Sequence, residues 1–155
     1  MQRTEVGEAY EASTSALQAA KGQRLSLRRA IEDLERALGA PGDDGAWRGR
    51  LDATLDHLRA VWAVHIDVTE GEGGLYEEIV ENAPRLANRV ARFRREHVEL
   101  AAAVQGGLDA TRDGDGEVGQ LRDRLVRLLA DLTRHRKRGL DLVYEAYHVD
   151  IGGES

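Results

Sequence analysis

Four rows of mostly apolar residues constrain the fold of this chain more than any other feature of its sequence. Within each row, successive residues are separated alternately by four and three positions, which places them on one face of a helix. The first row comprises Val6, Tyr10, Ser13, Leu17, Ala20, Arg24, Leu27, Ile31, Leu34 and Leu38. The second comprises Leu51, Leu55, Leu58, Trp62, His65 and Thr69. The third comprises Leu86, Val90, Phe93, His97, Leu100 and Val104. The fourth comprises Leu121, Leu125, Leu128, Leu132, His135, Gly139, Leu142 and Ala146.

Short segments that disfavour helix separate the four rows. They are GAPGDDG at 39–45, EGEGG at 70–74, Asn-Ala-Pro at 82–84 and GDGEVG at 114–119. No segment shows the period-two alternation of a strand. Four helices with short connections and one apolar face each predict an all-α, antiparallel up-down-up-down four-helix bundle, formed as a single domain over residues 1–155.

Composition excludes several classes of function. The chain has 155 residues, no cysteine and a formal net charge of -6. The absence of cysteine excludes disulfides, thiolate metal sites and cysteine nucleophiles. An acidic chain without a basic face is not expected to bind nucleic acid. No apolar run is long enough to span a membrane and the N-terminus lacks a signal-peptide core, so a cytoplasmic protein is predicted. Protein partners and oligomeric state stay open.

Each apolar row contains one large polar residue near its middle: Arg24, His65, His97 or His135. Counted from the helix connections, the three histidines lie at similar heights along the bundle. A single histidine in such a row is usually a hydrogen-bonded core residue. Burying three together costs desolvation unless they share a partner, and a metal ion is the simplest shared partner. We therefore predict that the three imidazoles meet in one layer of the core.

Three short segments carry a family resemblance. They are HIDVTEGEGGLYEEI around His65, RREHVEL with its Glu96-His97 pair, and LLADLTRHRKRGLDL around His135. In this order the segments resemble the hemerythrin-like, or HHE cation-binding, four-helix domains, and the resemblance covers about Leu17 to Tyr147. It implies a hemerythrin-like bundle. It also implies a di-iron centre that binds oxygen, senses iron or oxygen, or handles nitric oxide or peroxide.

The chain departs from the family pattern at three positions. Arg24 stands where the first helix should supply a histidine, and Thr69 and Gly139 stand where the family has carboxylates one turn after His65 and His135. A di-iron site needs bridging carboxylates to hold two cations together, and a guanidinium adds positive charge instead. These departures argue against a dinuclear iron centre of the oxygen-carrying kind.

Two interpretations follow, and the sequence leaves both open. In the first, His65, His97 and His135 hold one metal ion, iron or zinc, with Glu70 or water as the fourth ligand. Since Glu70 follows His65 by five residues, it reaches the ion only if the helix is distorted at EGEGG. The protein would then bind or sense a metal without catalysing a reaction.

In the second interpretation the site holds no metal. Arg24 would occupy the metal position and pair with Glu70, Glu72 or Glu96, and the bundle would act as a scaffold or protein-interaction module. An enzyme acting on peroxide or nitric oxide ranks below both, because it needs a redox-active metal with an open coordination position. Trp62 and Tyr76 are predicted to be packing residues, and His57, two turns before His65, a surface residue.

Overall fold

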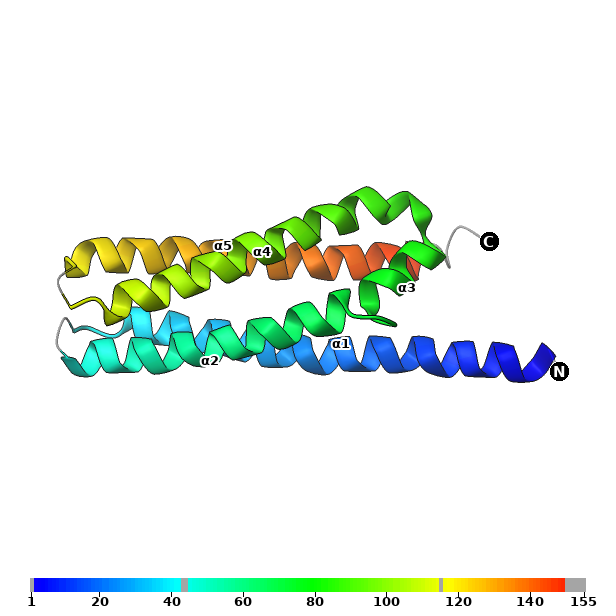
Figure 1. The fold of residues 1–155 in the computed structure, drawn as a ribbon, viewed down its shortest axis with the longest axis horizontal. Coiled ribbons are helices and arrows are strands. Elements are labelled where there is room, and N and C mark those ends of the chain that lie inside the picture. The colour runs from blue at the N-terminus through cyan, green and yellow to red at the C-terminus, as the bar shows by residue number, and fades with distance from the viewer. Residues whose placement is uncertain (1, 43–44, 115, 150–155) are drawn as a thin grey trace.

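The chain folds into a bundle of four long antiparallel helices (Figure 1). The computed structural model describes the backbone of residues 2–42, 45–114 and 116–149, and the side chains of residues 16–42, 45–114 and 116–147. The long helices are α1 (Gln2–Gly39), α2 (Gly45–Glu70), α4 (Ala87–Arg112) and α5 (Val118–Tyr144). A short helix α3 (Leu75–Asn82) and a 3₁₀ turn η1 (Pro84–Leu86) connect α2 to α4, and a π-helical segment η2 (Glu145–Val149) extends α5. Those ranges contain no strand, so the predicted all-α bundle is confirmed.

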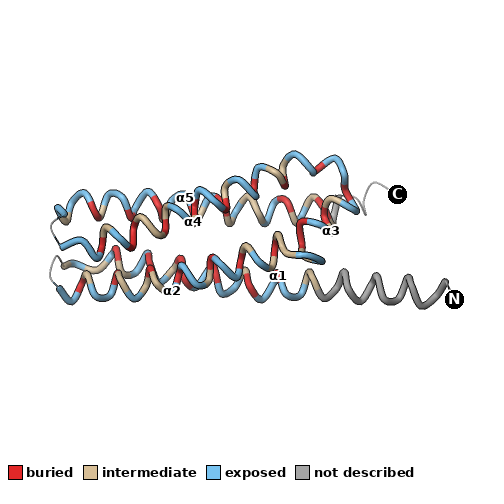
Figure 2. The backbone as a smooth tube through the Cα atoms, viewed as in Figure 1, coloured by how far each residue is buried: buried red, intermediate tan, exposed pale blue. Residues whose placement is uncertain are grey.

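Burial follows the four apolar rows, as Figure 2 shows by the buried faces turned toward the inside of the bundle. Every member of the second and third rows is buried. In the first and fourth rows, Leu17, Arg24 and Gly139 are partly exposed and the other described members are buried. The side chains of Val6, Tyr10 and Ser13 lie outside the described residues. No helix in the described ranges has the length and apolarity needed to cross a bilayer.

A polar layer divides the core into two apolar clusters. Along every long helix, the row passes from one cluster to the other across a short interval. These intervals run from Ala20 to Leu27 in α1, from Trp62 in α2 to Leu75 in α3, from Phe93 to Leu100 in α4, and from Leu132 to Leu142 in α5. Of the six buried polar side chains in the described part of the chain, five fall within them: Gln23, His65, Thr69, His97 and His135.

A tight glycine turn ends α2 and determines where Glu70 lies. Gly73 has φ of 70°, a left-handed conformation that glycine adopts without strain. A Cβ added to Gly71 would lie 2.4 Å from the Asp67 carbonyl oxygen, so only glycine fits there. The helix therefore stops at Glu70, and the chain turns into α3 directly beside the polar layer.

Candidate metal centre

His65, His97 and His135 converge in the polar layer from α2, α4 and α5. Their ring centroids are separated by 4.9 Å (His65 to His97), 5.6 Å (His65 to His135) and 5.0 Å (His97 to His135). One potential ligand nitrogen from each ring lies within 4.8 Å of the other two, and the residues are only 7%, 0% and 2% exposed, respectively. The predicted meeting of three imidazoles is confirmed.

A side chain from the preceding long helix contacts the Nδ1 atom of each imidazole. The pairs are Gln23 Oε1 with His65 Nδ1 at 2.7 Å, Glu70 Oε2 with His97 Nδ1 at 2.6 Å, and Glu96 Oε1 with His135 Nδ1 at 3.5 Å. An acceptor at Nδ1 keeps the proton on that atom and leaves the lone pair on Nε2. The three contacts thus favour, in each ring, the tautomer in which Nε2 carries the lone pair.

The buried environment keeps these imidazoles neutral. Desolvation, together with the smaller effects of the neighbouring His97 and His135, lowers the pKa of His65 to about 2. Desolvation likewise lowers the pKa of His97 to about 3, assisted by His135 and Arg94. The pKa of His135 is also lowered by desolvation, although Glu96 opposes this shift. At neutral pH all three rings therefore carry lone pairs.

The Nε2 atom of His65 has no hydrogen-bond partner among the described residues, although it is buried. Trp62 packs against all three imidazoles, stacked on His65 with ring centroids 4.8 Å apart and edge-on to His97 and His135. Its indole N–H donates to the carbonyl oxygen of His97 at 3.2 Å, so it is not available to His65. A buried ring nitrogen without a partner costs free energy unless a ligand such as a metal ion satisfies it.

Tyr76, predicted only as a packing residue, also enters the site. Its hydroxyl lies 3.2 Å from His97 Nε2, and the two rings stack with centroids 5.5 Å apart. Burial raises the pKa of Tyr76, so the phenol keeps its proton and donates it to the nitrogen. The glycine turn after α2 therefore places Tyr76 of α3 where its hydroxyl hydrogen-bonds to the Nε2 atom of His97.

The structure places Glu70 at the Nδ1 atom of His97, with Arg94 3.4 Å from its other carboxylate oxygen. Glu70 is not part of the three-histidine cluster. The ligand role predicted for it stays a prediction, which these contacts do not support. Glu96, in turn, is shared between His135 and Arg138. Glu70 thus pairs with His97 and Arg94, and Glu96 with His135 and Arg138.

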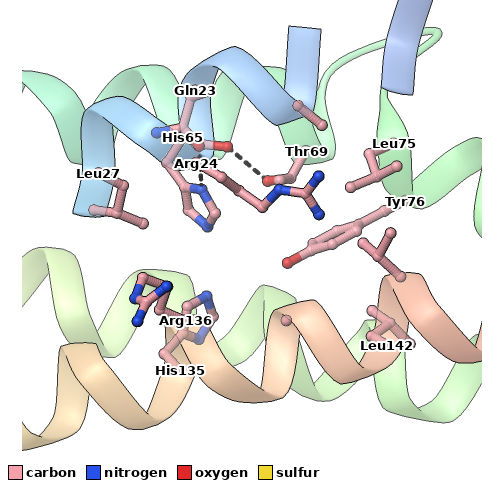
Figure 3. A pocket seen from close by; sticks show the side chains of 13 residues that line it. Gln23, Arg24, Leu27, His65, Thr69, Leu75, Tyr76, His135, Arg136 and Leu142 are labelled. Atoms are coloured by element: carbon pink, nitrogen blue, oxygen red, sulfur yellow. Dashed lines mark hydrogen bonds between the residues drawn. The ribbon is translucent and has the colours of Figure 1, made fainter. Parts of the chain in front are cut away.

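A small cavity lies beside the imidazoles, and its lining includes Arg24, Thr69 and Gly139. Figure 3 labels Arg24 and Thr69 among these residues. The cavity holds about 30 Å³ and also contacts His65 and His135. The side chain of Arg24 extends from α1 toward Thr69 and Tyr76 (Figure 3). One turn after His65, Thr69 offers a hydroxyl in place of a carboxylate. This hydroxyl donates to the backbone carbonyl of His65 at 2.7 Å.

Gln23 is the polar-layer residue of α1 that sequence reasoning missed. From Ala20 to Leu27 the apolar row can step either by four and three, through Arg24, or by three and four, through Gln23. The structure places Gln23 in the layer, only 7% exposed, and Arg24 at its margin. Hydrophobic spacing alone does not distinguish the two, so the sequence carried no signal that selects Gln23 over Arg24.

The donor set fits a single metal ion. Neutral imidazole nitrogens are ligands of zinc and ferrous iron, and a buried Nε2 without a partner is available at His65. Two nitrogens on one ion lie at most about 4.2 Å apart, since each metal–nitrogen distance is about 2.1 Å. The 4.8 Å spread of the cluster is slightly larger, so ion binding has to draw the rings together.

Comparison with known proteins agrees with this geometry. Residues 17–144 match the family model of the hemerythrin HHE cation-binding domain. Neither the curated proteins nor the solved structures contain a match to the chain. The matched region includes the polar-layer residues of all four long helices, among them the three histidines. The chain belongs to the hemerythrin HHE cation-binding domain family.

Proposed function

We propose that this protein binds one metal ion, iron or zinc, through the Nε2 atoms of His65, His97 and His135. The observation that carries the proposal is the set of Nδ1 contacts, which leaves three buried lone pairs in one layer. A bound metal ion would supply a Lewis-acidic centre with room for a further ligand. The role is a binding or sensing one in the cytoplasm, without catalysis.

The surrounding residues support a mononuclear site. Thr69 and Gly139 provide no carboxylate to bridge a second ion, and Arg24 brings a positive charge to the cavity edge. Glu70, Glu96 and Gln23 serve as acceptors that orient the rings, as the outer partners of metal-bound histidines commonly do. The three ligands then come from three helices, so binding ties α2, α4 and α5 together.

The alternative is a metal-free bundle that serves as a scaffold. In it, Arg24 pairs with a carboxylate such as Glu70, Glu72 or Glu96. The carboxylates of Glu70 and Glu96 contact imidazoles instead. The unpartnered Nε2 of His65 also favours metal binding over this alternative.

Elemental analysis of untagged protein tests the proposal. We expect about one equivalent of metal per chain in the purified protein, or after equilibration with zinc or ferrous iron and removal of free metal. Metal that binds only the folded state must also raise the melting temperature of the metal-free protein.

Matched variants give the test its specificity. His135→Ala should abolish both the bound metal and the shift in melting temperature, whereas His57→Ala, at an exposed position of α2, should leave both unchanged. Stoichiometric metal in His135→Ala would contradict the proposed ligand set. An absence of metal and of any thermal shift in the wild-type protein would favour the scaffold.

A further inference from the structure

An uncharged groove runs between α1 and α2, which lie side by side in the bundle (Figure 1). None of the nine residues that line it is charged, although 32% of the residues in the chain are. Its lining includes Ala19, Gly22 and Ser26 of α1, and Ala60, Val61 and Val64 of α2. The groove holds about 470 Å³, and Val64 is 53% exposed. Both helices therefore present uncharged surface to solvent here.

The polar side chains of the groove form hydrogen bonds within the chain. The amide nitrogen of Gln23 donates to the carbonyl oxygen of Val61 at 3.5 Å, and its amide oxygen contacts His65. The hydroxyl of Ser26 donates to the carbonyl oxygen of Gly22 at 3.4 Å. A Cβ at Gly22 would meet no neighbouring atom within 4 Å, so another backbone can approach α1 closely there. The groove thus suits a partner that is itself apolar and helical.

Two positions of opposite charge lie at the ends of this surface on α1. Arg29 is exposed and has no ion-pair partner among the described residues, whereas the adjacent Arg28 pairs with Glu32. Glu11 precedes Arg29 by five full helical turns, so the two positions lie on one line along α1, about 27 Å apart. The positions between them on this line, 15, 18, 22 and 26, are uncharged. The surface of α1 is therefore acidic at one end, basic at the other and uncharged between.

We propose that a second copy of the chain docks in this groove, with the two α1 helices antiparallel across a two-fold axis near residue 20. A two-fold interface makes every contact twice, so the position of Glu11 in each copy lies opposite Arg29 of the other. A parallel pairing of the two α1 helices would instead place like charges together.

The size of the contact surface sets the strength of this dimer. Two adjacent helices, each about 10 Å across, present roughly 500 Å² per copy over the length from Glu11 to Arg29. A standard stable interface buries about 800 Å² per partner. The dimer is therefore a weak one, with a dissociation constant in the micromolar range.

Analytical ultracentrifugation over a concentration series tests this interface. The wild-type chain should pass from monomer to dimer as its concentration rises. Val64→Glu places a charge in the groove and should weaken the dimer at least tenfold, because the interface would bury that charge without a partner. The matched control is Val98→Glu, which changes a valine on α4 that is 71% exposed and should leave the dimer unchanged. Circular dichroism checks that both variants keep the helical content of the wild type.

An exchange of charges tests the antiparallel orientation. Arg29→Glu and Glu11→Arg should each weaken the dimer about tenfold, because like charges then face each other at both ends. The double variant should restore the wild-type affinity. Arg28→Glu, which disrupts only the pair with Glu32 on the same helix, should leave the affinity unchanged.

Three results would overturn the inference. They are a wild-type chain that stays monomeric at every concentration, a dimer that Val64→Glu and Val98→Glu affect equally, and a double charge variant as weak as either single one. None of these measurements involves the three histidines, so the proposed metal site is tested separately.

Discussion

The Glu70 carboxylate lies 2.6 Å from the Nδ1 atom of His97 and so connects the last residue of α2 to the middle of α4. Equivalent contacts connect α1 to His65 through Gln23, and α4 to His135 through Glu96. Each of the three imidazoles is thus oriented by a side chain of the long helix that precedes it. The packing of the four helices, more than any local motif, brings the three imidazoles together.

The first prediction concerns Glu70. Glu70→Gln replaces a charged acceptor by a neutral one at the Nδ1 atom of His97, and we expect metal affinity to fall by about tenfold or more. Competition with a chromophoric chelator measures this change. The control is Glu72→Gln, at an exposed position two residues further along the chain, which should bind metal as the wild type does.

The same variant separates an orienting role from a ligand role for Glu70. If Glu70 orients His97, the cobalt spectrum of the loaded variant keeps the shape of the wild-type spectrum. If Glu70 is a ligand, the spectrum changes with the loss of its oxygen. An unchanged affinity would show that the 2.6 Å contact has no influence on the site.

The second prediction concerns Tyr76. In the metal-free protein its hydroxyl donates to His97 Nε2 at 3.2 Å and so competes with a metal ion for that lone pair. Tyr76→Phe should lower the stability of the metal-free protein by about 1 kcal/mol and raise metal affinity about fivefold. Denaturant unfolding and chelator competition measure the two effects. A loss of affinity would instead identify Tyr76 as a ligand.

The third prediction concerns pH. The folded-state pKa values of His65 and His97, about 2 and 3, lie below the usual value of 6.5, and that of His135 is also lowered. At a pH between the folded-state pKa values and 6.5, the unfolded chain binds more protons than the folded chain. The metal-free protein therefore loses stability as the pH falls below 6.5. Each histidine contributes up to about 1.4 kcal/mol per pH unit.

Denaturant unfolding between pH 7 and pH 5 measures this slope. His65→Leu should reduce this slope by the contribution of one buried histidine. His57→Asn, at an exposed position, should leave the slope unchanged. A stability that is constant across this range would mean that the three rings take up protons in the folded protein.

The fourth prediction concerns two helical glycines. A Cβ at Gly139 would meet no atom within 4 Å, whereas a Cβ at Gly107 would lie 3.0 Å from Leu125, which is fully buried. Gly139→Ala should therefore stabilise the metal-free protein by about 0.5–1 kcal/mol through helix propensity. Gly107→Ala should gain less or lose stability, because Leu125 has to move. Thermal unfolding of the two variants side by side measures the difference.

The helical spacing of apolar residues was sufficient to predict the bundle, the burial of its rows and the meeting of His65, His97 and His135. A repeat of alternating four and three steps places each residue on a defined helix face. Once the helices are paired, the height of each histidine follows from the helical rise. These properties depend on positions along a regular helix, which the order of residues specifies directly.

Only the tertiary packing decided which side chains contact the three imidazoles. Gln23, rather than Arg24, reaches His65, because both positions fit the same row and only the contact between α1 and α2 distinguishes them. Glu70 contacts the side of His97, and Tyr76 its Nε2 atom, because the glycine turn after α2 sets where the chain continues. Side-chain direction at a helix end depends on the packing of the adjoining helices, and no spacing of residues along one helix contains that information.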